Sequence, residues 1–146
     1  MEEHPGQKLE DVVMLLNLEN KVKDIPLIVN NLSGPEEVFD GKTINFLDEI
    51  SKSILSNKKS LKFPDLVTFA FWCRKSNLNK ISGYYKRNKL VLGRGVILHI
   101  APSNVPMNFC YSLTFGLLSG NSNIVRLPSR NFIQIKIFNQ ILKKNY

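Results

Sequence analysis

The chain has 146 residues, of which 43% are hydrophobic and 22% charged, so it is long enough for one domain with a real core. The formal net charge is +8. No apolar run approaches the roughly 20 residues that a membrane span requires, and the acidic N-terminus is unlike a secretory signal, so we predict a cytoplasmic protein with no membrane span.

The first apolar runs, residues 12–16 and 25–29, are separated by turn-forming residues and predict two short strands. Pro26 lacks a backbone donor, which favours an edge position for the second strand. Residues 43–56 have helical apolar spacing, and Thr43 is a candidate cap.

A second helix is predicted over residues 64–76, where Pro64 suits the first turn. Residues 77–94 are polar and basic, and they predict a solvated loop or an amphipathic strand. Tyr84 and Tyr85 beside Lys86 and Arg87 could instead form a stacking surface for nucleic-acid bases, a less favoured interpretation.

The remainder of the chain alternates between strand and helix patterns. Residues 96–100 are almost continuously apolar, as in a buried parallel strand. A helix is predicted over residues 107–119 and ends at Gly120, a second strand follows over residues 123–127, and Ser129 is a candidate cap for a last helix. This order predicts parallel pairing.

We therefore predict an α/β fold in which a mixed segment over residues 1–90 precedes a parallel strand–helix unit over residues 91–146. Ligands of open parallel sheets bind beyond the carboxyl ends of the strands, which places residues 101–106 and 126–129 at the working edge. The loop lacks the GxGxxG fingerprint. His99 precedes this loop and is interpreted as a buried, hydrogen-bonded histidine rather than a catalytic base.

The two cysteines, Cys73 and Cys110, are too few for a disulfide framework and lack a CxxC partner or a nearby histidine. We predict that both are ordinary semi-buried residues and that the chain holds no metal site.

Charge is divided unevenly along the chain. Residues 1–50 carry eleven acidic and four basic residues, whereas residues 51–146 carry sixteen basic residues and one acid, Asp65. The basic half could bind nucleic acid, meet the phosphates of a cofactor or acyl carrier, or face acidic surfaces elsewhere in the protein. Nucleic-acid binding is the less favoured of these, because no helix-turn-helix, zinc-finger or RNA-recognition signature accompanies the charge.

Three ordered segments carry a family resemblance. Pro102-Ser103-Asn104-Val105-Pro106, Leu118-Ser119-Gly120-Asn121 and Arg126-Leu127-Pro128-Ser129 resemble the first cofactor-binding unit of the aldehyde dehydrogenase superfamily. The amino-acid sequence of residues 95–106 and 120–129 is similar to that of the long-chain acyl-CoA reductases of the bacterial luminescence type.

The resemblance implies an aldehyde-dehydrogenase-like fold with a partial parallel Rossmann-type sheet, in which residues 91–146 are the start of a nucleotide-binding domain. It also implies a reductase that converts a fatty acyl-CoA or another acyl thioester into a fatty aldehyde with NADPH, through an acyl-enzyme on a cysteine. In the family that cysteine lies further along, in another domain, so we expect this chain to be an N-terminal part that is inactive alone. Acyl-transferase and acyl-activating subunits, and a homo-oligomer of the complete enzyme, are the implied partners.

The resemblance also assigns candidate site residues. Asn104 matches the asparagine whose amide helps to hold the oxyanion. The alternative is that Asn104 only caps the helix or shapes the turn. Ala101, Pro102 and Ser103 match the cofactor-binding loop, although many members carry tryptophan at the position of Ser103.

Many relatives have a lysine that holds the adenosine ribose. If the alignment is counted forward from Gly120, this lysine corresponds to Arg126. If it is counted back from Pro128, the lysine corresponds to Leu127. Arg126 is favoured because a cation can meet a ribose hydroxyl or a 2′-phosphate. Ser129 is also a candidate cofactor-binding residue.

Two other classes of function remain open. The chain could be a non-catalytic fragment or split subunit that needs a partner chain. Less favoured is a basic module that binds nucleic acid or a carrier.

Overall fold

The computed structural model describes residues 13–16, 34–85, 90–128 and 130–145. Within them the elements are β1 (Val13–Leu16), α2 (Gly41–Ser56), the 3-10 turn η3 (Ser60–Lys62), α3 (Pro64–Trp72), α4 (Lys75–Tyr85), β2 (Val96–Ile100), α5 (Asn108–Leu118), β3 (Ser122–Arg126) and α6 (Ile133–Asn145). The predicted α/β class is confirmed.

The three described strands form one parallel sheet in the order β1-β3-β2. Ile124 of β3 lies opposite Met14 of β1 and Leu98 of β2. The strand predictions over 12–16, 96–100 and 123–127 are thus confirmed to within a residue at each end. The run at 25–29 lies outside the described residues.

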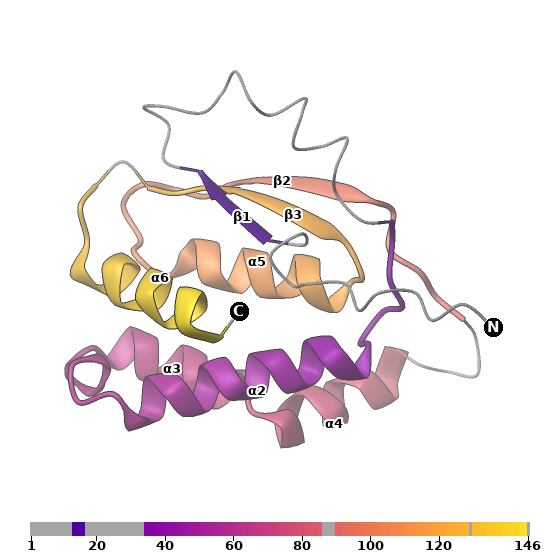
Figure 1. Ribbon diagram of the computed structural model, residues 1–146, viewed down its shortest axis with the longest axis horizontal. Helices are drawn as coiled ribbons and strands as arrows, with labels where there is room; N and C mark the ends of the chain where they lie inside the picture. Colours follow the sequence, from indigo (N-terminus) through magenta and orange to yellow (C-terminus); the bar gives the residue numbers. More distant parts are fainter. Residues whose placement is uncertain (1–12, 17–33, 86–89, 129, 146) are drawn as a thin grey trace.

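The helices form two layers on one face of the sheet (Figure 1). Helix α5 lies directly against β2 and β3, α6 lies beside α5 and packs against α2, and α2, α3 and α4 form the layer farther from the sheet. Three aromatic side chains join the layers, because the ring of Phe138 in α6 lies 5.6 Å from that of Phe69 in α3 and 5.7 Å from that of Phe109 in α5. All three are almost fully buried.

Helix α2 begins two residues before the predicted start. The cap is Asp40 rather than Thr43, because the Asp40 carboxylate accepts a hydrogen bond of 3.0 Å from the Thr43 backbone N–H. Thr43 therefore supplies the donor of this cap, and the sequence-based choice was wrong.

The predicted helix over 64–76 is two helices. α3 ends at Trp72, and α4 begins at Lys75 and continues to Tyr85, where a loop or strand was predicted. The break is held by hydrogen bonds, since the Asn77 amide donates to the Trp72 carbonyl oxygen at 2.8 Å. Leu78 is the buried residue of α4, so this helix has no apolar stripe that the sequence could reveal.

Strand β2 is half exposed, contrary to the buried strand that its apolar run predicts. Val96, Leu98 and Ile100 on one face are 41, 57 and 66% exposed, whereas His99 on the other face is 8% exposed. β2 is an edge strand of the described sheet, and among the described residues its outer face is not covered.

The predicted stop of α5 at Gly120 is confirmed. Gly120 has φ +69°, in the left-handed region that favours glycine, and its N–H donates to the Leu117 carbonyl oxygen. A side chain at this position would collide with the Glu36 backbone. The last helix begins at Ile133, and its candidate cap, Ser129, lies outside the described residues.

Candidate functional site

The candidate residues lie at the carboxyl ends of two adjacent strands. Ile100 and Arg126 are register partners and each ends its strand, so the loop 101–106 and the segment after Arg126 leave the same edge of the sheet. Ala101 is half-buried against the core, whereas residues 102–104 are exposed. The fold thus brings together five of the six sequence-predicted residues, and the sixth, Ser129, is not described.

Asn104 lies in a turn and does not cap α5. That helix begins at Asn108, and its N-cap is Met107, which makes no side-chain cap hydrogen bond. The exposed amide of Asn104 makes no hydrogen bond within the described part of the chain. One alternative role, helix capping, is therefore excluded, and the amide is accessible to a ligand.

Arg126 and Leu127, the two alternative matches to the lysine that holds the adenosine ribose, differ in burial. Arg126 is exposed, whereas Leu127 is 7% exposed and belongs to the hydrophobic core. Of these two residues, only Arg126 has a side chain that can contact a ligand at the sheet edge.

A hollow of about 290 Å³ lies beside the end of β3, and its described walls come from the β3–α6 connection and the first turns of α6. It presents two cations, Arg130 and Lys136, and the half-buried ring of Phe132. The side-chain oxygen of Asn139 is buried there without a partner among the described residues. Sequence patterns did not predict this hollow, because its lining is divided between the β3–α6 connection and one face of α6.

Beneath the edge, His99 is fully hydrogen-bonded, as predicted. Its Nδ1 lies 2.7 Å from the Ser112 hydroxyl of α5, and its Nε2 lies 2.8 Å from the side-chain oxygen of Asn123 in β3. Asn123 is fully buried. Sequence reasoning missed both partners, although an asparagine in an apolar strand was a usable signal.

Both cysteines are free, as predicted, but they are fully buried rather than semi-buried. Removal from water raises the pKa of the Cys73 thiol to about 12, although a hydrogen bond with Thr114 opposes the shift. Complete burial raises the pKa of Cys110 as well. A thiolate is the reactive form of cysteine, so neither residue suits the role of nucleophile at neutral pH.

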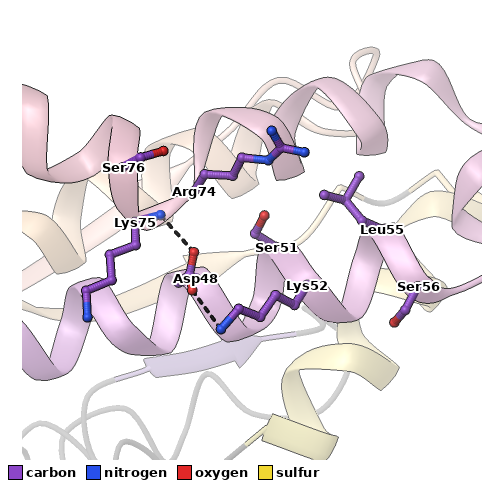
Figure 2. A pocket seen from close by; sticks show the side chains of 8 residues that line it. All are labelled: Asp48, Ser51, Lys52, Leu55, Ser56, Arg74, Lys75 and Ser76. Atoms are coloured by element: carbon purple, nitrogen blue, oxygen red, sulfur yellow. Dashed lines mark hydrogen bonds and ion pairs between the residues drawn. The ribbon is translucent and has the colours of Figure 1, made fainter.

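A second hollow, of about 600 Å³, lies between α2 and the turn that joins α3 to α4 (Figure 2). The Asp48 carboxylate at its edge accepts hydrogen bonds from the Lys75 backbone N–H at 2.8 Å and from the Lys52 ammonium at 2.9 Å. The Lys75 hydrogen bond, followed by that of Lys52, lowers the pKa of Asp48. None of the sequence-predicted site residues lies here.

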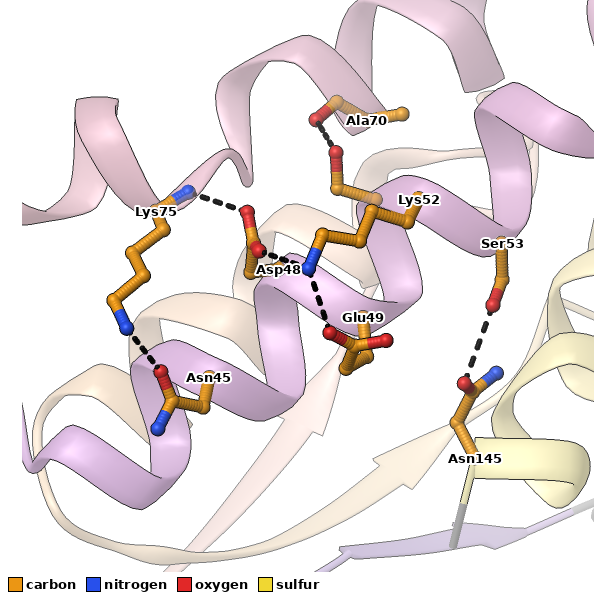
Figure 3. A network of polar contacts seen from close by, with 9 residues as sticks. Asn45, Asp48, Glu49, Lys52, Ser53, Ala70, Lys75 and Asn145 are labelled. Atoms are coloured by element: carbon orange, nitrogen blue, oxygen red, sulfur yellow. Dashed lines mark hydrogen bonds and ion pairs between the residues drawn. The ribbon is translucent and has the colours of Figure 1, made fainter.

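Figure 3 shows how this cluster joins the helices. The Lys75 ammonium donates to Asn45 at 2.7 Å, Lys52 also contacts Glu49 at 2.7 Å, and the buried Ser51 hydroxyl donates to the Ala70 carbonyl oxygen at 2.6 Å. These groups are already paired with one another. We interpret the cluster as structural support for α4.

The fold and the edge residues define an α/β protein whose exposed polar groups lie at the carboxyl ends of parallel strands. A comparison with protein families matches residues 43–146 to the family acyl-CoA reductase (LuxC). The chain belongs to this family, which confirms the resemblance to acyl-CoA reductases and indicates an oxidoreductase that acts on an acyl substrate. Neither the curated proteins nor the solved structures contain a match to the chain.

Within the described ranges, no helix is long and apolar enough to cross a membrane. The same residues contain no group of three or more histidine, cysteine, aspartate or glutamate side chains placed to hold a metal ion.

Proposed function

We propose that the chain is the N-terminal part of an NADPH-dependent fatty acyl-CoA reductase of the aldehyde dehydrogenase superfamily, which forms a fatty aldehyde. The observation that carries this proposal is the exposed Asn104 amide at the carboxyl edge of the sheet, within the segment that matches the reductase family. The complete reaction consumes an acyl-CoA, NADPH and a proton, and it yields the aldehyde, free coenzyme A and NADP⁺.

The role of Asn104 follows from the chemistry of its side chain. The NH₂ group donates hydrogen bonds without titrating, so it can stabilise the negative charge that develops on the thioester carbonyl oxygen. The loop holds this donor at the surface, where an acyl group can approach.

The nucleophile must come from outside this chain. An acyl-enzyme requires an accessible thiolate, and both cysteines here are buried thiols with raised pKa values. A catalytic cysteine in another part of the complete enzyme is therefore part of the proposal, and the chain alone should be inactive.

The residues at the edge fit an NADPH molecule. Arg126 offers an exposed cation for a ribose hydroxyl or the 2′-phosphate, and the hollow beside β3 adds two cations and the unpartnered Asn139 oxygen. Residues 101–103 would border the nicotinamide ribose, with Ser129 as a further candidate. When bound, NADPH supplies the hydride.

The test is Asn104→Ala in the complete reductase. Loss of an oxyanion donor should lower kcat by a factor of about 10²–10³, with little change in the KM for NADPH. Asn79→Ala is the matched control, because Asn79 is an exposed asparagine on α4, away from the sheet edge. An unchanged kcat in Asn104→Ala would remove Asn104 from the mechanism.

The second candidate is a split subunit that needs a partner chain, and it is favoured by the burial of both cysteines. Mixing the purified chain with the separately expressed remainder of the reductase should then restore activity that neither part shows. A cytoplasmic location, acyl-transferase and acyl-activating partners and a homo-oligomer remain predictions.

A further inference from the structure

A buried polar set, His99, Ser112 and Asn123, lies where the loop that carries Asn104 is anchored. His99 is the next-to-last residue of β2, and Ser112 lies in the second turn of α5. The loop 101–107 connects these two elements. The hydrogen bond between His99 Nδ1 and the Ser112 hydroxyl therefore joins the strand before the loop to the helix after it.

The hydrogen-bond network assigns the ring tautomer. The Asn123 amide nitrogen donates to the Asn121 carbonyl oxygen at 2.6 Å, which turns the Asn123 side-chain oxygen toward His99. An amide oxygen only accepts, so His99 Nε2 carries the proton and donates. In the neutral ring, Nδ1 is then an acceptor, and the Ser112 hydroxyl donates to it.

The set is tightly enclosed. A Cβ atom at Gly116 would collide with the Asn123 side-chain oxygen and press on His99 Nε2, so α5 approaches the sheet closely at this point. His99 is 8% exposed and Asn123 is fully buried, and hydrogen bonds in such surroundings fix geometry more firmly than exposed ones do.

We propose that His99 is a positioning residue that acts through Asn104: its hydrogen bond to Ser112 closes the loop 101–107 and fixes where the Asn104 amide lies. The Asn123 bond has a different role, because it joins β2 to β3 and contributes to the stability of the sheet. This inference rests on the proposed function of Asn104.

Two substitutions of His99 separate the two bonds. The amide nitrogen of Gln falls near Nε2 of the ring and can still donate to Asn123, so His99→Gln loses mainly the Ser112 bond. The side-chain oxygen of Asn falls near Nδ1 and can still accept from Ser112, so His99→Asn loses mainly the Asn123 bond. We expect His99→Asn to have the lower melting temperature but the higher kcat of the two.

Opposite rankings are the signature of positioning, because a merely structural residue would lower kcat and melting temperature in the same order. In the complete reductase, His99→Gln should lower kcat about tenfold with the KM for NADPH unchanged. Ser112→Ala should do the same. Ser119→Ala is the matched control, since Ser119 follows the same helix and its hydroxyl donates to the Phe115 carbonyl oxygen, away from the loop.

A double-mutant cycle tests the route through Asn104. In an Asn104→Ala background, Ser112→Ala should cause no further loss of kcat, because the donor that it positions is already absent. A multiplicative loss, or the same ranking of the two His99 variants by kcat and by melting temperature, would overturn the proposal.

Hydrogen exchange gives a readout that does not depend on activity. The backbone N–H of Cys110, which donates to the Met107 carbonyl oxygen at the end of the loop, should exchange about tenfold faster in Ser112→Ala than in Ser119→Ala, measured on the complete chain. Unchanged exchange would contradict the proposal that the Ser112 hydrogen bond holds the loop 101–107, even if the enzyme is an active reductase. Faster exchange in a protein without reductase activity would support the closed loop while contradicting the proposed function.

Discussion

The Asp48 carboxylate shows how one residue can hold an element that the sequence pattern does not predict. It accepts the first backbone N–H of α4 while it contacts Lys52 on its own helix. A side chain from α2 therefore caps α4, and no local motif near Lys75 reveals this.

Asp48→Ala should lower the free energy of unfolding by about 1 kcal/mol at neutral pH, since α4 loses its cap. Asp48→Asn should cost less because it keeps an acceptor oxygen. The measurement is urea denaturation of each variant. Equal stability of the Ala variant and the unsubstituted protein would contradict the capping role.

The same carboxylate makes stability depend on acid. Its pKa in the folded state lies below the ordinary 3.8, so its contribution is complete above that value and is lost as the pH falls through the lowered one. Denaturation between pH 5 and pH 2 should therefore show a weaker acid dependence in Asp48→Asn than in the unsubstituted protein. Identical pH profiles would contradict this assignment.

Arg126 is the residue most directly tied to cofactor affinity. Arg126→Ala should weaken NADPH binding roughly 10- to 150-fold, because a charged hydrogen bond is typically worth about 1.5–3 kcal/mol. Titration of NADPH in the complete reductase measures this. Arg94→Ala is the control, because Arg94 is an exposed arginine before the opposite end of β2. Equal affinity in both variants would make Arg126 a plain surface charge.

At the scale of elements, apolar periodicity predicted the helices and strands that are held by packing. It missed the features that depend on hydrogen bonds. The apolar spacing of α2 and the strand–helix–strand order of β2, α5 and β3 were predicted from hydrophobic patterns, and the fold confirms these elements, although β2 is half exposed. α4 has little apolar pattern, so a loop was predicted there. The network around His99 also could not be predicted in detail, because its partners come from three elements that only the tertiary fold brings together.

The close approach of α5 to the sheet gives a prediction for this element pair. Gly116→Ala should lower the free energy of unfolding by about 1–3 kcal/mol, because the added methyl group collides with the Asn123 side chain. Gly83→Ala in α4 has open space at its Cβ and should stabilise the protein by about 0.5–1 kcal/mol. Thermal denaturation of both variants tests the contrast, and equal effects would contradict the packing described for α5.

At the scale of the whole molecule, the parallel sheet holds the candidate residues at one edge and the helices support it from one face (Figure 1). Sequence resemblance identified the edge residues, and the family match over residues 43–146 supports the enzyme class. The uneven division of charge along the chain does not point to a function, since the basic residues of the described part are spread over several elements.

The most direct test of the central claim is to follow the hydrogen at C4 of the NADPH nicotinamide into the product of the complete reductase. The enzyme is supplied with a long-chain acyl-CoA and NADPH deuterated at both C4 positions of the nicotinamide, and the products are identified by mass spectrometry. The account predicts a fatty aldehyde that carries one deuterium, together with equal amounts of free coenzyme A and NADP⁺. An unconsumed acyl-CoA, or an aldehyde without deuterium, would contradict it.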